Sequence, residues 1–328
     1  MFLQEILLPK PATTAIIVGR KVAKDSQREN QSMEASKQVS PLNPLAEVFG
    51  FPTDNHSPDA QRHRRAKLCP FHNKVPNCTK DKALDPLGVC AVYDSGEATI
   101  TCPIRFRENW IIADDAASFF FPAGTSWTSL AEIRLKDGNG LSAGNIDVVL
   151  VSYDDRGRIV DFGSLEVQAV YISGNVRNPF YQYMQNQTAD MEWRGANYPR
   201  ADYLSSSRKR LAPQLLYKGG IFQQWKKKQA VALHKSFYAT LPALPEVTPQ
   251  EADIAWFLYK LQFNAAENRY HLIRDRVVYT AFEPAMLRIT TAPAGAIEDF
   301  IAHLQSRLND HLTAPDAPTL QDILKGSD

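Results

Sequence analysis

Two neighbouring β-branched runs constrain the fold of this chain most strongly. Residues 145–153 read NIDVVLVSY, residues 159–171 are again rich in Ile, Val and Leu, and Asp154-Asp-Arg-Gly157 between them is a turn sequence. β-Branched residues pack well on a pleated sheet, and a short polar turn with glycine joins antiparallel neighbours. The pattern predicts a β-hairpin near the middle of the chain.

Acidic and amide side chains interrupt both runs of this hairpin. Asp147 lies near the start of the first run, and Glu166 and Gln168 lie on the second. Residues two apart on a strand face the same side of the sheet, and the adjacent strand can bring Asp147 beside them. A solvated strand face is the ordinary explanation, but polar groups inside so apolar a segment need partners or a metal.

Such a group of oxygen ligands suits metal-dependent phosphodiester hydrolysis. Mg²⁺ prefers carboxylate oxygens and keeps positions open for water and a phosphate oxygen. We therefore predict that Asp147 and Glu166 bind Mg²⁺, and that the amide of Gln168 orients the attacking water. Metal-binding carboxylates on a hairpin of this kind are most commonly followed by lysine at this position. Glutamine, unlike lysine, carries no positive charge.

The segments around the hairpin predict a mixture of helices and strands, hence an α/β or α+β core. Residues 126–136 (SWTSLAEIRLK) fit a helix with a capping box formed by Ser129 and Glu132, and Glu132 could add a fourth oxygen to the site. The other predicted elements are a mainly helical stretch from 202 to 238 interrupted at Pro213 and Gly219-Gly220, strands over 254–263 and 270–282, and an amphipathic helix over 296–312.

All four cysteines of the chain lie close together in the sequence, at Cys69, Cys78, Cys90 and Cys102. In a reducing cytosol, such clustering favours a metal site over disulfides. Four thiolates can make a closed, structural site for zinc or iron. The spacing contains no Cys-x-x-Cys pair, so free buried cysteines remain the alternative.

The charge balance restricts any nucleic-acid surface to part of the chain. The formal net charge is only +1, yet residues 203–245 contain no Asp or Glu and include the basic run Arg208, Lys209 and Arg210. A solvated helical face would look similar, but local charge asymmetry of this kind suits a phosphate backbone. The sequence has no apolar run long enough for a membrane span and begins without secretory features, so we expect a cytoplasmic protein.

Several motifs resemble those of NotI-type restriction endonucleases, most clearly between residues 69 and 171. They are Leu68-Cys-Pro-Phe71, Pro76-Asn-Cys-Thr-Lys80, Leu87-Gly-Val-Cys90, Ile100-Thr-Cys-Pro-Ile-Arg-Phe106, Ala143-Gly-Asn-Ile-Asp-Val-Val149 and Leu165-Glu-Val-Gln-Ala-Val-Tyr171. The resemblance implies a PD-(D/E)XK nuclease core, with a mixed central sheet flanked by helices, in a homodimeric type II restriction enzyme. It implies magnesium-dependent cleavage of double-stranded DNA at a GC-rich palindrome with a GGCC centre.

The resemblance also assigns residues. It places the active site on Glu132, Asp147, Glu166 and Gln168, and a structural iron, rather than zinc, on the four cysteines. From the resemblance together with the pattern along the chain, we expect a segment of unclear role (1–60), a four-cysteine metal-binding region (61–110), and a catalytic and DNA-binding core (111–328).

Base recognition is harder to assign. Readout of G·C pairs calls for Arg at guanine and carboxylates at cytosine. Arg177, Arg194, Arg200 and Asp202 follow the hairpin and are the candidates, although each could equally be a surface ion-pair partner.

Two other functions remain open at this point. A non-catalytic DNA-binding metalloregulator would use the cysteines and the basic segment without needing Asp147 or Glu166. A structure-specific repair nuclease could use the same core without recognising a fixed palindrome, because this kind of core serves many purposes.

Overall fold

The computed structural model describes residues 43–313 apart from 73, 83, 189–191 and 195–196. Most of the predicted N-terminal segment 1–60 therefore lies outside the described residues. The chain forms two compact units, residues 1–289 and 290–328. In the second unit, the predicted amphipathic helix is confirmed as α9 (Ile297–Thr313), and its large apolar side chains are exposed.

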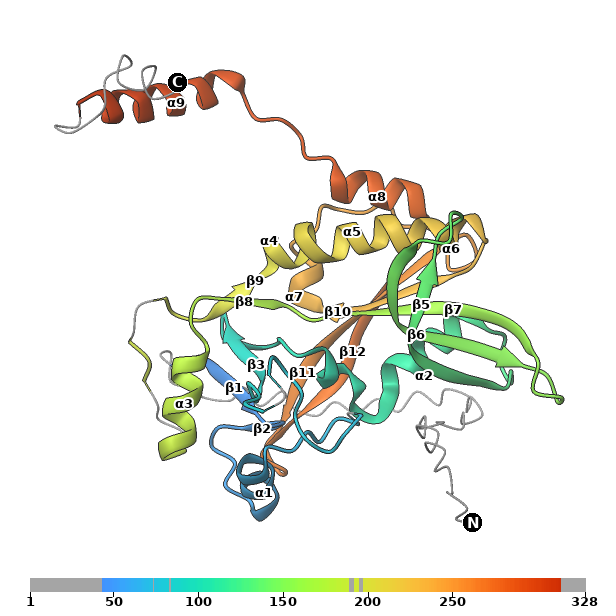
Figure 1. Ribbon diagram of the computed structural model, residues 1–328, viewed down its shortest axis with the longest axis horizontal. Helices are drawn as coiled ribbons and strands as arrows, with labels where there is room; N and C mark the ends of the chain where they lie inside the picture. Colours follow the sequence, from blue (N-terminus) through green and yellow to red (C-terminus); the bar gives the residue numbers. More distant parts are fainter. Residues whose placement is uncertain (1–42, 73, 83, 189–191, 195–196, 314–328) are drawn as a thin grey trace, which may run out of the picture. The chain divides into compact units, whose positions relative to one another are not determined.

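The first unit is built around a six-stranded mixed sheet in the order β12-β11-β10-β7-β6-β5 (Figure 1). Its strands are β5 (Trp127–Lys136), β6 (Ser142–Tyr153), β7 (Ile159–Gln168), β10 (Gln229–His234), β11 (Ile254–Asn264) and β12 (Arg269–Thr280). Strand β10 runs parallel to both β7 and β11, whereas the other neighbours are antiparallel. The predicted α/β class, with a large mixed sheet flanked by helices, is thus confirmed.

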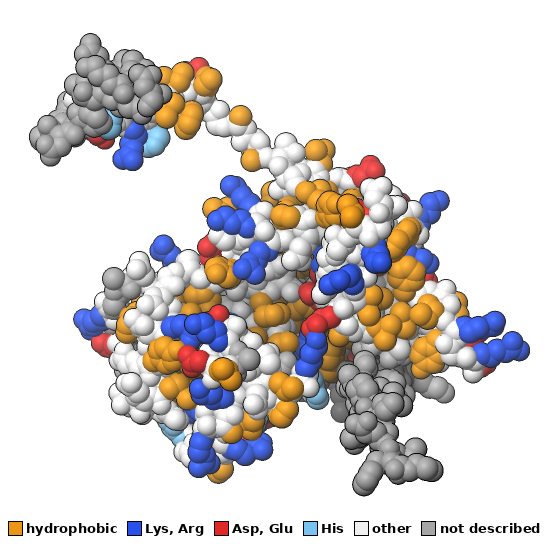
Figure 2. Space-filling view, viewed as in Figure 1, with side chains coloured by type: hydrophobic (Ala, Val, Ile, Leu, Met, Phe, Trp, Pro, Cys, Tyr) orange, Lys and Arg blue, Asp and Glu red, His pale blue; other side chains and the backbone are white. Residues whose placement is uncertain are grey.

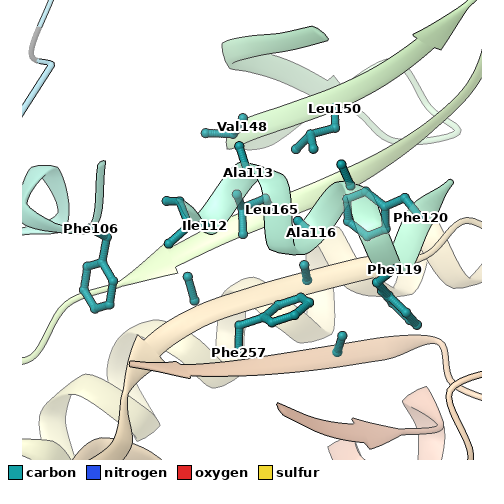
Figure 3. Packing of buried hydrophobic residues seen from close by; sticks show 14 of the residues in the cluster. Phe106, Ile112, Ala113, Ala116, Phe119, Phe120, Val148, Leu150, Leu165 and Phe257 are labelled. Atoms are coloured by element: carbon teal, nitrogen blue, oxygen red, sulfur yellow. The ribbon is translucent and has the colours of Figure 1, made fainter. Parts of the chain in front are cut away.

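One face of the sheet is covered by helix α2 (Ile111–Phe120), as Figure 3 shows. Ile112, Ala116 and Phe120 are buried in one cluster with Leu150 of β6 and Phe257 of β11. Successive strand residues point to opposite faces, so the sheet needs a second apolar layer on its other side.

That second layer is a helical segment running from residue 203 to 224. It comprises α4 (Tyr203–Ser206), α5 (Ala212–Gln214) and α6 (Gly220–Gln224), joined by the π-helical turns η2 (Ser207–Leu211) and η3 (Leu215–Gly219). Leu211 and Leu215 pack against Val231 and Leu233 of β10, whose alternate residues Ala230 and Ala232 face α2. Helices α7 (Lys235–Tyr238) and α8 (Phe282–Thr290) complete the set on this unit's sheet.

Two secondary-structure predictions were wrong. The segment predicted as a helix over 126–136 forms strand β5 instead, because pairing with β6 outweighs the local helical pattern and the capping-box spacing of Ser129 and Glu132. The stretch 202–238 was expected to be helical with breaks, but it stays helical through Pro213 and then forms β10. The π-helical turn η2, just before Pro213, changes the local hydrogen bonding where proline lacks an N–H donor.

A second sheet, in the order β2-β1-β3-β4, carries part of the cysteine region. Its strands are β1 (Leu45–Val48), β2 (Phe51–Pro52), β3 (Val89–Asp94) and β4 (Glu97–Ile100), with α1 (Pro58–Ala66) following β2. A short sheet of β8 (Tyr171–Ser173) and β9 (Arg200–Asp202) and helix α3 (Arg177–Asn186) complete the unit, together with the 3-10 segment η1 (Pro103–Trp110).

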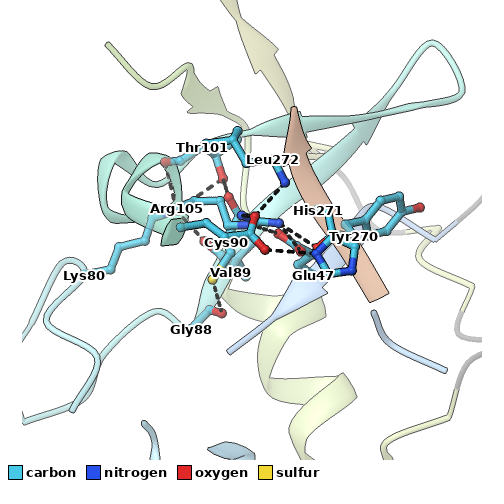
Figure 4. Close-up of polar contacts among 11 residues, drawn as sticks. Glu47, Lys80, Gly88, Val89, Cys90, Thr101, Arg105, Tyr270, His271 and Leu272 are labelled. Atoms are coloured by element: carbon cyan, nitrogen blue, oxygen red, sulfur yellow. Dashed lines mark hydrogen bonds and ion pairs between the residues drawn. The ribbon is translucent and has the colours of Figure 1, made fainter. Parts of the chain in front are cut away.

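A buried ion-pair network joins the two larger sheets (Figure 4). The Arg105 guanidinium donates to the Glu47 carboxylate of β1 at 2.7 Å (Nε–Oε2) and to the Glu108 carboxylate at 2.7 Å (Nη1–Oε2). It also donates to the main-chain oxygen of Tyr270 in β12 at 3.0 Å. The side chains of Arg105 and Glu47 are both 0% exposed, so neither charge has water as an alternative partner.

Candidate active site

The predicted hairpin is present, and it places Asp147 and Glu166 side by side. The last registered pair of the β6–β7 ladder is Val148–Leu165, and one step further Asp147 and Glu166 lie opposite each other. Asp147 Oδ2 accepts a hydrogen bond from the Val167 main-chain N–H at 2.9 Å. Both carboxylates are on the sheet face opposite α2, because their neighbours Val148 and Leu165 are buried in the α2 cluster.

A lysine from the helical segment contacts this pair of carboxylates. Lys218, on η3, is almost fully buried and places its Nζ 2.7 Å from Oε1 of Glu166. The same ammonium donates to the main-chain oxygen of Asn145 at 2.9 Å. Nothing local in the sequence connects Lys218 with a strand residue so distant along the chain, so its place in the site could not be predicted.

The other oxygen of Glu166, Oε2, is buried and has no hydrogen-bond partner among the described residues. Burial first and the neighbouring Asp147 carboxylate second raise the pKa of Glu166 to about 7, against the lowering effect of Lys218. A buried carboxylate oxygen without a donor, next to a second carboxylate, is a strong ligand for a hard cation. The residues therefore fit Mg²⁺, which would be held by Glu166 Oε2 and Asp147.

Glu132 is also near this pair, but on a strand rather than a helix. It lies opposite Asp147 between two registered pairs of β5 and β6, with a left-handed φ of 55°. Its carboxylate is half exposed and forms an ion pair with Lys74, from the cysteine region. The structure thus brings Glu132, Asp147 and Glu166 onto three adjacent strands.

Gln168 lies at the end of β7, beside an open pocket. Its amide Nε2 donates to the main-chain oxygen of Ala169 at 2.8 Å. The pocket has a volume of about 210 Å³, and its lining includes Asp147, Gln168, Arg210 and Gln214. Arg210 also lies over the ring of Tyr171, 4.6 Å from its centroid. The pocket combines a carboxylate with a cationic side chain, which suits a phosphate group approaching a metal.

The four cysteines converge on a different cavity, in the smaller sheet and the loops beside it. Cys69, Cys78, Cys90 and Cys102 are free thiols and all line one cavity of about 10 Å³, roughly the room that one water molecule needs. Burial raises the pKa of all the cysteines for which a shift is resolved, to about 11 for Cys69. In this arrangement, however, the described residues contain no group of three or more His, Cys, Asp or Glu placed to hold a metal ion.

The DNA-binding candidates are dispersed. Arg177 forms ion pairs with Asp81 and Asp85 of the cysteine region, and Arg194 pairs with Glu192. The carboxylate of Asp202 caps α4 by accepting from the Ser205 main-chain N–H, and Arg200, Arg208, Lys209 and Arg210 are exposed. Lys and Arg side chains are spread over the visible face rather than gathered in one patch (Figure 2).

No helix in the described part of the chain is both long enough and apolar enough to cross a membrane.

Comparison with known proteins identifies the family. A family model described as restriction endonuclease NotI matches residues 54–272, which is more than half of the 328 residues and includes both the cysteines and the hairpin. A search of curated proteins finds no match. Members of this family are restriction endonucleases, that is, site-specific deoxyribonucleases that bind double-stranded DNA. On the strength of this match, the chain belongs to the NotI restriction endonuclease family.

Proposed function

We propose that this protein cleaves double-stranded DNA at a GC-rich palindromic site by magnesium-dependent hydrolysis of the phosphodiester bond, as a type II restriction enzyme. The observation that carries the proposal is the pairing of Asp147 with the buried Glu166, whose Oε2 has no hydrogen-bond donor among the described residues. Two adjacent carboxylates repel each other, and a divalent cation bound between them would offset that repulsion.

Bound Mg²⁺ would lower the pKa of a coordinated water and offset charge on the phosphate in the transition state. The protein's own residues do the remaining work. Asp147 is held in place by the Val167 N–H, so that its carboxylate would face the metal in a fixed orientation. Gln168 can orient the attacking water by hydrogen bond once its amide leaves the Ala169 oxygen. Arg210, at the rim of the same pocket, is suited to bind a phosphate oxygen of the backbone.

A homodimer follows from the proposed target. Two copies of one active site related by a two-fold axis cut both strands of a palindrome. Readout of G·C pairs would need Arg and carboxylate side chains in the major groove, for which Arg200 and Asp202 on β9 remain candidates. Arg177 is a weaker candidate because its guanidinium is engaged by Asp81 and Asp85.

We also propose that the cysteine cavity holds one structural metal ion, iron or zinc. The support is that four thiols from separate segments line one small cavity. Metal binding would require the thiols to move closer and to release their protons, since their pKa values are high without a metal. Elemental analysis of the purified protein tests this directly, with one iron or zinc per chain expected.

The nuclease proposal is tested by incubating the protein with long, unmethylated GC-rich DNA, with and without Mg²⁺. Discrete fragments that need Mg²⁺ and share one sequence at their ends are expected. DNA binding without cleavage would favour a DNA-binding regulator. Cleavage confined to branched DNA, without a common sequence, would favour a repair nuclease.

A further inference from the structure

Lys218 contacts the carboxylate pair from the helical segment 203–224, and it is not part of the hairpin that carries Asp147, Glu166 and Gln168. Lys218 is separated from Glu166 by the whole stretch that forms β8, α3 and β9, yet its Nζ lies 2.7 Å from Glu166 Oε1. The side chains of Lys218 and Glu166 are each 8% exposed, so water screens this ion pair poorly.

The local structure around Lys218 is built to hold it. Its ammonium makes a second bond to the Asn145 main-chain oxygen, and its aliphatic stem passes over Gly144, whose φ of 106° favours glycine. It belongs to the π-helical turn η3, and π-helical turns occur frequently at functional sites.

The segment presents polar side chains to the site at a regular spacing. Arg210 and Gln214 line the pocket that contains Asp147 and Gln168, and Lys218, four residues after Gln214, contacts Glu166. Residues four apart lie on the same face of a helix, so one face of the segment covers the carboxylates.

Meanwhile Gln168, at the position where this kind of motif commonly has lysine, has its amide bonded to the Ala169 oxygen and carries no charge. Among the described residues, the fixed cation in contact with Glu166 therefore comes from another element of the fold, as Lys218.

We propose that Lys218 is a positioning residue for the active site: it supplies from the helical segment the fixed positive charge that Gln168 cannot supply, and it holds Glu166 by Oε1 so that Oε2 is free for the metal. The assignment rests on the proposed Mg²⁺-dependent function. Lys218 and the cation then share the negative charge of the same two carboxylates.

This sharing predicts opposite effects on metal binding and on cleavage. In Lys218→Met the competing charge is gone, so DNA-free protein should bind Mg²⁺ at least about tenfold more tightly, measured by Mg²⁺ titration of the thermal unfolding temperature. Cleavage at saturating Mg²⁺ should nevertheless fall by about 100-fold, because Glu166 is no longer fixed. A lysine with only a structural role would not tighten Mg²⁺ binding.

Two further variants complete the experiment. In Lys218→Met/Gln168→Lys the charge returns from the neighbouring strand position, and Mg²⁺ affinity should return to within about threefold of the unsubstituted protein. The control is Lys228→Met, which removes a half-buried lysine that also donates to a main-chain oxygen, that of Phe119, at 3.1 Å. It should change neither Mg²⁺ affinity nor cleavage.

If Lys218→Met folds poorly, Lys218→Met/Glu166→Gln decides the matter, because it removes both charges. The double variant should then unfold at a higher temperature than Lys218→Met. Unchanged Mg²⁺ affinity in Lys218→Met, or a double variant no more stable than the single one, would overturn the assignment. Tightened Mg²⁺ binding in a protein whose unsubstituted form cuts no DNA would instead refute only the nuclease proposal.

Discussion

Asp147 and Glu166 lie opposite each other on adjacent strands, and the carboxylate of Asp147 is tied to β7 by the Val167 N–H at 2.9 Å. This contact places the partly buried Asp147 carboxylate beside the buried Glu166, and the negative charge of Asp147 helps to raise the pKa of Glu166. The proposed active site depends on this pair of carboxylates.

The first prediction concerns pH. The pKa of Glu166 is raised to about 7, above its ordinary value of 4.5, chiefly by burial. The folded protein therefore binds more protons than the unfolded chain between these values, and this group's contribution to stability is present below pH 4.5 and lost as pH rises through 7. Because a metal needs the ionised form, cleavage at limiting Mg²⁺ should rise about tenfold per pH unit below pH 7. A flat profile between pH 6 and 7 would contradict this.

The second prediction concerns His234, at the end of β10. Burial lowers its pKa to about 4 from an ordinary 6.5, and its Nδ1 accepts from the Ser236 main-chain N–H. Here the unfolded chain binds more protons, so stability is fully present above pH 6.5 and is lost as pH falls toward 4, by roughly 3 kcal/mol. In His234→Asn, which keeps an acceptor for Ser236, urea unfolding at pH 7 and at pH 5 should show a smaller pH-dependent loss. An equal loss in both proteins would exclude His234 as its source.

The third prediction concerns the buried network around Arg105. Arg105→Met leaves the carboxylates of Glu47 and Glu108 buried without their cation, so the free energy of unfolding should fall by about 3–5 kcal/mol in urea titrations. A matched control is Arg158→Met, which breaks the exposed pair with Asp154 and should cost about 0–1 kcal/mol. Similar losses in both variants would show that burial of the network does not set its strength.

The fourth prediction concerns the cysteines. If the cavity holds a metal, Cys90→Ser should lower the bound metal to well below one per chain and reduce the thermal unfolding temperature. Treatment with a chelator should lower the unfolding temperature of the unsubstituted protein and leave that of Cys90→Ser nearly unchanged. A metal-free protein with the same unfolding temperature as its Cys90→Ser variant would leave the four thiols as ordinary buried side chains.

The sequence predicted those parts of the fold and site that depend on local pattern. The β6–β7 hairpin and strands β11 and β12 follow from β-branched runs and turn residues, and the carboxylates Asp147 and Glu166 meet because register is fixed by the hairpin. Strand β5 was mistaken for a helix because LAEIRL also has helical spacing, and only pairing with β6 decides between the two.

Long-range relationships could not be predicted in this way. Lys218 contacts Glu166 because β10 pairs with β7, and the helical segment that precedes β10 then lies over the sheet beside Glu166. The one signal in the sequence was the four-residue spacing of Arg210, Gln214 and Lys218, which marks a polar helical face but does not say what that face covers.

The most direct test of the central claim compares Asp147→Asn with Asp161→Asn on unmethylated GC-rich DNA at saturating Mg²⁺. Both changes remove one negative charge, but Asp161 is at the other end of β7, where it pairs with Lys227. We predict that Asp147→Asn cleaves about 1,000-fold more slowly, equal to about 4 kcal/mol, while still binding DNA, and that Asp161→Asn cleaves at nearly the unsubstituted rate. Full cleavage by Asp147→Asn would show that the carboxylate pair is not the active site.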